Sequence, residues 1–195
     1  MLFFLNFRNI NLNSVMSNII LHGKSFKPFI PNSKIESVID SVAEKIENDY
    51  KGSDEVPVLL CVLNGAIMFT AGLMKRLTIP LELVSMKLSS YVGTKSTGQV
   101  LETMGITGDI SGREVIICED IVDTGNTIIA LKEMLLAKGA KKVKICTMLL
   151  KPEVFANKAH LDYVGLEIPN AFIVGYGLDF DELGRNIKDI YVIDE

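Results

Sequence analysis

The segment Val115–Ile129 reads VIICEDIVDTGNTII, and it decides the fold. Four apolar residues lead into Glu119 and Asp120, and the polar run DTGNT then leads into an apolar helical pattern. A buried strand followed by a polar loop and a helix is the repeating unit of α/β sheets. The carboxyl end of such a strand is where these sheets bind ligands. The segment therefore predicts both an α/β fold and the place of its site.

Apolar runs of the same kind recur along the chain, and most are continuous rather than alternating. Continuous runs are typical of parallel strands that are covered on both faces. The expected strands are Val58–Leu63, Leu81–Lys87, Val115–Cys118, Val143–Leu150, Phe172–Gly175 and Ile190–Ile193. Helical patterns at Ser33–Tyr50, Ala66–Leu77 and Thr127–Lys138 separate several of them, and Ser33 with Glu36 has the spacing of a capping box. Together these patterns predict a doubly wound, mostly parallel sheet.

Two regions do not follow this alternation. Residues 89–98 read SSYVGTKSTG and continue into a second loop-like stretch, Glu102–Gly112. Loops of this length in a compact domain are usually functional or disordered. After Lys151 short strands dominate, which predicts a small additional subdomain.

The length of 195 residues suits one domain. We expect residues 1–18 to be a disordered N-terminal extension and residues 19–195 to form a single domain. The first residues do not fit a signal peptide, because their apolar run precedes Arg8 and no small-residue cleavage site follows it.

Composition excludes several classes of protein. A hydrophobic content of 48% with 23% charged residues is foreign to disordered and collagen-like chains, and a net charge of −4 argues against a basic nucleic-acid arm. The uncharged stretch Val56–Met74 has about the length of a membrane span. Asn64 and Gly65 interrupt it, so we expect a buried strand, a turn and a helix instead.

The three cysteines, Cys61, Cys118 and Cys146, are an odd number and each lies within an apolar stretch. This pattern favours buried free thiols over disulfides or metal ligands, and it predicts a cytoplasmic protein.

The loop after the acidic strand has the features of an anion site. Thr124, Gly125, Asn126 and Thr127 can offer backbone N–H groups and hydroxyls at a helix N-terminus. Neither G-x-x-x-x-G-K-[ST] nor G-x-G-x-x-G occurs, so a Walker ATPase or a Rossmann dehydrogenase finds no support.

Three carboxylates beside a phosphate site, Glu119, Asp120 and Asp123, fit a sugar and a divalent cation. Carboxylates accept hydrogen bonds from vicinal hydroxyls and hold Mg²⁺ directly or through water. The alternative is a helix-capping cluster in which Asp123 stabilises the helix dipole. The complete pattern E-D-x-x-D-T-G-x-T favours a functional site.

This segment resembles the phosphoribosyl-pyrophosphate (PRPP) motif of type I phosphoribosyltransferases, an apolar run followed by E-D-I-I-D-T-G-x-T. Leu63-Asn64-Gly65 resembles the pyrophosphate loop of the purine branch, and Leu88–Gly98 resembles its lid. The tail, VGLEIP at 164–169 followed by FIVGYGLD at 172–179, is similar to hypoxanthine-guanine phosphoribosyltransferases. The resemblance covers about Ile19 to Glu195 and implies the type I fold with a small hood subdomain built from the chain ends.

The reaction that the resemblance implies is transfer of the 5-phosphoribosyl group from PRPP to N9 of hypoxanthine or guanine. The products are inosine or guanosine monophosphate and pyrophosphate, with Mg²⁺ as cofactor, in purine salvage. The resemblance further implies a homodimer or homotetramer that acts on small molecules, with no nucleic-acid or membrane partner.

The resemblance also implies residue roles, with Asp123 facing N7 of the purine as general base. The residues implied to bind the 5′-phosphate and ribose are Glu119, Asp120, Thr124, Gly125, Asn126 and Thr127. The pyrophosphate residues are Asn64, Gly65 and Arg185, the lid residues Ser90 and Tyr91, the purine-binding residues Lys151, Phe172 and Ile173, and the metal-binding residues Glu119, Asp120 and Asp179. Asn64 departs from a lysine often found at its position, and the resemblance suggests a cis Leu63–Asn64 peptide.

Two kinds of alternative remain. A regulatory protein could keep the PRPP fold and bind nucleic acid, although a net charge of −4 without a basic stripe argues against this. An enzyme of the same fold could use another acceptor. A lysine donor at Lys151 disfavours adenine, whose 6-amino group cannot accept its hydrogen bond, and pyrimidines are disfavoured too, while xanthine stays open.

Overall fold

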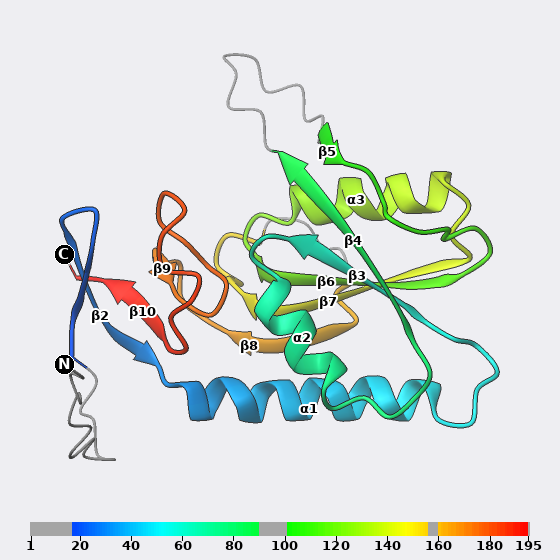
Figure 1. The fold of residues 1–195 in the computed structure, drawn as a ribbon, viewed down its shortest axis with the longest axis horizontal. Helices are drawn as coiled ribbons and strands as arrows, with labels where there is room; N and C mark the ends of the chain where they lie inside the picture. Colours follow the sequence, from blue (N-terminus) through cyan, green and yellow to red (C-terminus); the bar gives the residue numbers. More distant parts are fainter. Residues whose placement is uncertain (1–16, 90–100, 156–159, 195) are drawn as a thin grey trace, which may run out of the picture.

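The computed structural model describes residues 17–89, 101–155 and 160–194 (Figure 1). In chain order the elements are β1 (Ile19–Leu21), β2 (Lys24–Ile30), α1 (Asn32–Tyr50), β3 (Val58–Leu63), α2 (Ile67–Met74), β4 (Glu82–Ser89), β5 (Leu101–Met104), β6 (Glu114–Val122), α3 (Asn126–Ala137), β7 (Lys142–Leu150), β8 (Tyr163–Glu167), β9 (Ile173–Val174) and β10 (Ile190–Ile193).

The central sheet has the strand order β5-β4-β3-β6-β7-β8. Strands β4, β3, β6, β7 and β8 are parallel, and β5 pairs antiparallel with β4 at one edge. The register places Val58 of β3 opposite Val115 of β6. This arrangement confirms the expected mostly parallel sheet.

Helices cover both faces of this sheet, with α1 and α2 on one face and α3 on the other (Figure 1). Successive side chains of a strand point to opposite faces, so a single strand feeds two cores. Leu59 of β3 packs in the core of α1 and α2, while Leu60 packs in the core of α3. The doubly wound fold therefore follows from continuous apolar strands, as expected.

A second, antiparallel sheet joins the two ends of the chain in the order β1-β2-β10-β9, and we refer to it as the hood. Its small core is formed by Phe26, Val174 and Tyr191. Pro28 lies inside β2 opposite Tyr191, next to an irregularity in the pairing with β10, and such bulges are where a strand tolerates proline. The expected subdomain from the chain ends is confirmed.

The expected capping box at Ser33 and Glu36 is wrong. Helix α1 has its N-cap at Pro31, whose side chain cannot cap. Asp189 supplies the cap instead, because its carboxylate accepts a 2.7 Å hydrogen bond from the backbone N–H of Asn32. Glu36 is therefore left to pair elsewhere.

Other boundaries also differ from the expected ones. Strand β6 does not stop at Cys118 but runs to Val122, because Glu119 and the residues after it stay paired with β7. The stretch Glu102–Gly112 is not a loop throughout, since it begins in the edge strand β5. The sequence patterns did not predict strands β1, β2 and β8.

Residues 1–16 of the expected N-terminal extension (residues 1–18) lie outside the described residues. Its last residue, Asn18, donates side-chain hydrogen bonds to Ser25 and to Asp194, at opposite ends of the chain.

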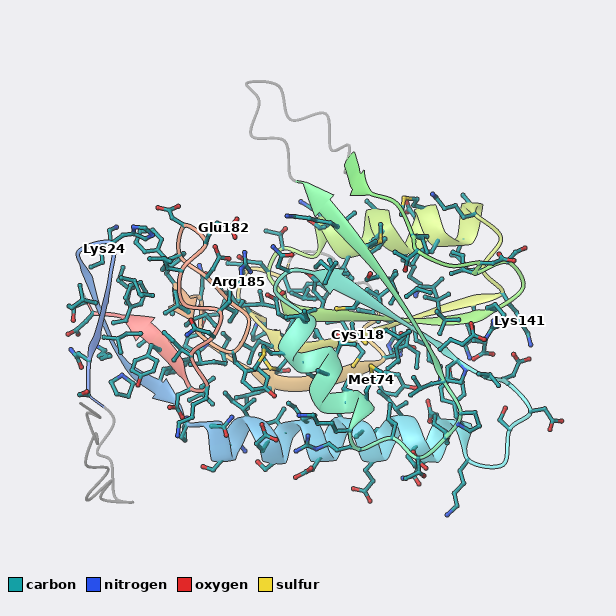
Figure 2. All side chains as sticks on the ribbon, in the orientation of Figure 1. Lys24, Met74, Cys118, Lys141, Glu182 and Arg185 are labelled. Atoms are coloured by element: carbon teal, nitrogen blue, oxygen red, sulfur yellow. The ribbon has the colours of Figure 1, made fainter. Side chains whose placement is uncertain are left out.

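The uncharged stretch Val56–Met74 forms β3, a turn and α2, as expected. Within the part of the chain that the structure describes, no helix has both the length and the apolar character needed to cross a membrane. The three cysteines are free and buried, on three adjacent strands. Figure 2 labels one of them, Cys118 of β6.

Candidate active site

The loop between β6 and α3 turns sharply at Gly125, which has a φ of +83°. This left-handed conformation is one that glycine adopts readily. A Cβ on Gly125 would also lie 2.5 Å from a ring carbon of Phe155, so the ring closes off the space beneath the loop. Sterics and backbone conformation both require glycine here, and the loop is held close to the start of α3.

A hollow of about 120 Å³ lies against this loop. Its lining residues are Glu119, Ile121, Val122, Asp123, Thr124, Gly125, Thr127 and Ile128. Asn126 begins α3 and is exposed, but it is not among the lining residues. Because the first backbone N–H groups of a helix have no partner within the helix, the hollow has the donors of an anion site.

A second group of predicted residues meets on the other side of β6. The Leu63–Asn64 peptide is cis, as the resemblance suggested. At Gly65 a Cβ would lie only 1.8 Å from a carboxylate oxygen of Asp120. At Gly177 a Cβ would lie 2.0 Å from the carbonyl oxygen of Gly65. The backbone at Gly65 therefore lies between the carboxylate of Asp120 and the backbone of Gly177, as close to both as glycine allows.

Arg185 adjoins this contact, on the loop that joins β9 to β10 of the hood (Figure 2). Its guanidinium donates a 2.9 Å hydrogen bond to the carbonyl of Gly177 and forms a 2.8 Å ion pair with Asp179. The other oxygen of Asp179 accepts a 2.8 Å hydrogen bond from the backbone N–H of Glu182. The Nε atom of Arg185 is buried and has no acceptor among the described residues.

Glu119 and Asp120 are adjacent on β6, so their side chains point to opposite sides of the strand. Glu119 lines the hollow, while Asp120 faces Gly65. Burial raises the pKa of Glu119 well above its usual value, and the neighbouring Asp120 adds to the effect. Burial likewise raises the pKa of Asp120 to about 6, with Arg185 opposing this shift and Asp179 adding to it. Burial therefore disfavours the ionised form of each carboxyl, and additional donors or a cation would favour it.

These carboxylates do not form a closed metal cage. Among the described residues, no three His, Cys, Asp or Glu side chains are grouped so that they could hold a metal ion. The expected set of Glu119, Asp120 and Asp179 is divided by β6, with Glu119 on the side of the hollow and Asp120 on the side of Gly65.

Lys151 directly follows β7 and is buried. Its Nζ atom lies 3.4 Å from a carboxylate oxygen of Asp123, across the ends of two neighbouring strands. The register of β6 and β7 brings these two side chains together. Val122 is paired with Leu150, and the two charged residues directly follow this pair.

The predicted purine-binding residues of the hood differ in exposure. Phe172 is 46% exposed, although its ring has Phe180 edge-on at 5.5 Å between ring centroids. Ile173 begins β9 and its side chain is buried. Ser90 and Tyr91, the predicted lid residues, lie outside the described residues.

Three residues that contribute to this geometry were not predicted: Phe155 beneath Gly125, and Tyr176 with Gly177 beside Gly65. The sequence carried a signal for the last two, because a G-Y-G run in an apolar segment indicates unusual backbone conformation. It carried none for Phe155, whose contact depends on the path of the loop after β7.

Comparisons with known proteins agree with this geometry. The family model described as "Phosphoribosyl transferase domain" matches residues 30–181. The hypoxanthine-guanine phosphoribosyltransferase of Streptococcus thermophilus is 41% identical over 155 residues, covering 79% of this chain and 85% of that protein. That of Aquifex aeolicus is 34% identical over 176 residues, covering 90% and 98%.

Solved structures show the same similarity. The crystal structure of a hypoxanthine-guanine phosphoribosyltransferase from Bacillus anthracis superposes with a TM-score of 0.81 at 34% identity, covering 86% of this chain and 98% of that one. The hypoxanthine phosphoribosyl transferase of Trypanosoma cruzi gives a TM-score of 0.82 at 35% identity, covering 90% and 95%.

Proposed function

This chain belongs to the phosphoribosyl transferase family, among the hypoxanthine-guanine phosphoribosyltransferases, and we propose that it transfers the 5-phosphoribosyl group of PRPP to N9 of hypoxanthine or guanine. The observation that carries the proposal is the pairing of Asp123 with Lys151 at the rim of an anion hollow. This arrangement sets a proton acceptor and a cationic donor beside the place for a sugar phosphate.

At the phosphate end, the 5′-phosphate of PRPP binds in the hollow at the start of α3. The backbone N–H groups from Thr124 to Thr127 and the threonine hydroxyls are its donors. Glu119 borders the same hollow and accepts hydrogen bonds from the ribose hydroxyls. Its raised pKa supports this assignment, because hydroxyl donors stabilise the carboxylate form.

At the other end, the pyrophosphate of PRPP binds beside Asn64 and Gly65. Their backbone supplies N–H donors, and Arg185 supplies a guanidinium that neutralises charge on the leaving group. The buried Nε atom of Arg185 supports this role, because it is a donor without an acceptor among the described residues.

The carboxylates of the site suit a Mg²⁺ ion that binds together with PRPP. This cation is usually held by one or two carboxylates together with substrate phosphates and waters rather than by a protein cage. Asp120 and Asp179 fit that description: both lie at the pyrophosphate end, and the charge of Asp179 adds to the raised pKa of Asp120. When bound, Mg²⁺ neutralises charge on the leaving pyrophosphate.

The purine base lies between the hood and the end of β7. Lys151 donates to its 6-oxo group, Phe172 stacks on its ring, and the backbone of Ile173 offers hydrogen bonds. As N9 attacks C1′ of the ribose, the bond from C1′ to pyrophosphate breaks and Asp123 accepts the proton of N7. Closure of the loop that contains Ser90 and Tyr91 excludes water from the oxocarbenium-like centre.

We also infer a homodimer or homotetramer in the cytoplasm. Helix α2 leaves Ile67, Met68 and Met74 exposed, and Leu83 of β4 is exposed as well. A helix that is apolar on all sides is usually buried, which supports a second copy against this face. Three free, buried cysteines suit a reducing compartment.

The test is an assay of purified protein with PRPP, Mg²⁺ and each of five bases: hypoxanthine, guanine, xanthine, adenine and uracil. We expect nucleotide and pyrophosphate in equal amounts from hypoxanthine, guanine or both. Turnover of neither would refute the proposal, and turnover of xanthine alone would reassign the acceptor.

A further inference from the structure

Tyr176 lies between Gly175 and Gly177 on the loop that leads from the hood to Arg185. Its side chain is 4% exposed, and its backbone φ is +49°. Residues other than glycine seldom adopt this left-handed conformation, and they keep it where the surrounding structure imposes it. We therefore expect the residues packed around Tyr176 to impose this backbone conformation.

The hydroxyl end of Tyr176 lies between the two helices on one face of the sheet. It is 3.4 Å from a carboxylate oxygen of Glu36 in α1. A Cβ on Gly72 of α2 would lie 3.3 Å from the same hydroxyl. Arg76, just after the end of α2, joins the helices with a 2.8 Å ion pair to Glu36 and a 3.1 Å hydrogen bond to the carbonyl of Gly72. The ring is therefore fixed by both helices.

The protonation of this group matches its position. Burial raises the pKa of Tyr176 to about 12, and the charge of Glu36 adds to the shift. A hydrogen bond from Arg76 holds the pKa of Glu36 below its usual value. Tyr176 is thus a neutral donor facing an ionised acceptor at any physiological pH.

The backbone end of Tyr176 connects directly to the pyrophosphate end of the site. Its N–H donates a 2.7 Å hydrogen bond to the carbonyl of Ile187. The next residue, Gly177, donates to the carbonyl of Arg185 at 3.0 Å and accepts from the guanidinium of Arg185 at 2.9 Å. Gly177 also packs on the carbonyl of Gly65, where no side chain would fit.

We propose that Tyr176 is a positioning residue for the pyrophosphate of PRPP. With its ring held between α1 and α2, it sets the distance between Gly177 and Gly65 and fixes the direction of Arg185. The inference rests on the proposed function and adds to it a side chain that contacts no substrate.

The experiment compares Tyr176→Phe and Tyr176→Leu with the unaltered protein. Because small displacements of binding groups are costly, we expect Tyr176→Leu to raise both the KM for PRPP and the Kd of pyrophosphate with Mg²⁺ about tenfold. We expect Tyr176→Phe, which keeps the ring, to raise both about threefold. The KM for hypoxanthine should change less than about twofold, because Lys151 and Phe172 belong to other parts of the site.

Tyr163→Phe is the matched control. Tyr163 is also buried, and its hydroxyl donates a 2.6 Å hydrogen bond to Asp49. It lies at the first residue of β8, whereas the site lies at the carboxyl ends of the parallel strands. We expect this control to lower stability without changing the KM for PRPP.

The proposal is overturned if the Tyr176 variants bind pyrophosphate as the unaltered protein does, or if Tyr163→Phe weakens it equally. Should Tyr176→Leu fail to fold, Tyr176→Phe and Glu36→Gln decide by the same measurements. Calorimetric binding of pyrophosphate does not depend on turnover. An unaltered protein that binds pyrophosphate but turns over no purine would refute the proposed function and still test Tyr176.

Discussion

Lys151 places its ammonium nitrogen 3.4 Å from a carboxylate oxygen of Asp123, joining the ends of β7 and β6. The lysine side chain is 11% exposed and the aspartate side chain is 53% exposed. The lysine is therefore buried, and the aspartate is open to solvent. A 6-oxopurine carries O6 and N7 side by side on one edge. The pair thus matches that edge, with a donor for O6 and an acceptor for the N7 proton.

Asp123→Asn tests the acceptor. An amide has nearly the same shape but cannot take the proton, so we expect kcat to fall about 100-fold or more. The Kd of PRPP, measured by calorimetry, should change little because the phosphate donors remain. Asp54→Asn, in the exposed loop between α1 and β3, is the control and should leave kcat unchanged. A normal rate for Asp123→Asn would remove this residue as the base.

Lys151→Met tests the donor. Methionine fills similar space without the charge, so the 6-oxo group loses its partner. We expect kcat/KM for hypoxanthine to fall about 100-fold while the KM for PRPP stays within about twofold. An equal rise in both KM values would show a general disturbance of the site rather than loss of purine recognition.

Gly65→Ala tests the close approach at the pyrophosphate end. The added Cβ would lie 1.8 Å from Asp120, so either the loop or the carboxylate must move. We expect the KM for PRPP to rise at least tenfold, by the general cost of displaced binding groups. Gly105→Ala is the matched control, because a Cβ there meets nothing within 4 Å. Similar kinetics for the two variants would contradict a tight contact.

Sequence patterns predicted those parts of the fold that depend on local information. The strand Val58–Leu63 has its expected bounds, because a continuous apolar run ends at a polar turn. The bounds of β6 could not be predicted, because Glu119 and Asp120 are polar and yet stay in the strand. The pairing of Glu119, Ile121 and Val122 with β7 is a tertiary contact that outweighs local preference.

In the candidate site, too, local contacts could be predicted from the sequence and non-local contacts could not. Most residues of the motif at 119–127 line one hollow because they are close in sequence, while Asp120 points to the other side of β6. The cap of α1 depends on Asp189, which is 157 residues from Asn32, and a local capping box was predicted in its place. Phe155 beneath Gly125 is equally non-local. Contacts of this kind arise from the path of the chain, which no local pattern records.

A partly buried ion pair near the start of β7 predicts how stability depends on pH. Lys144 lies 2.7 Å from a carboxylate oxygen of Asp49, and the hydroxyl of Tyr163 is bonded to both. Hydrogen bonds from Lys144 and then Tyr163 lower the pKa of Asp49. A carboxyl whose pKa is lower in the folded state adds stability that is complete above its unfolded pKa of about 4 and is lost as pH falls through the folded pKa.

Asp49→Asn should therefore destabilise the protein at neutral pH and progressively less below about pH 5. Because the Asp49 side chain is 46% exposed, we expect a modest loss of about 1–2 kcal/mol at pH 7, smaller than for a fully buried pair. Urea unfolding of the unaltered protein and the variant at several pH values measures this difference. Asp54→Asn should give a difference near zero throughout. A loss for Asp49→Asn that stays constant well below pH 4, through the range in which the unfolded carboxyl is protonated, would show that the ion pair does not set the pH dependence.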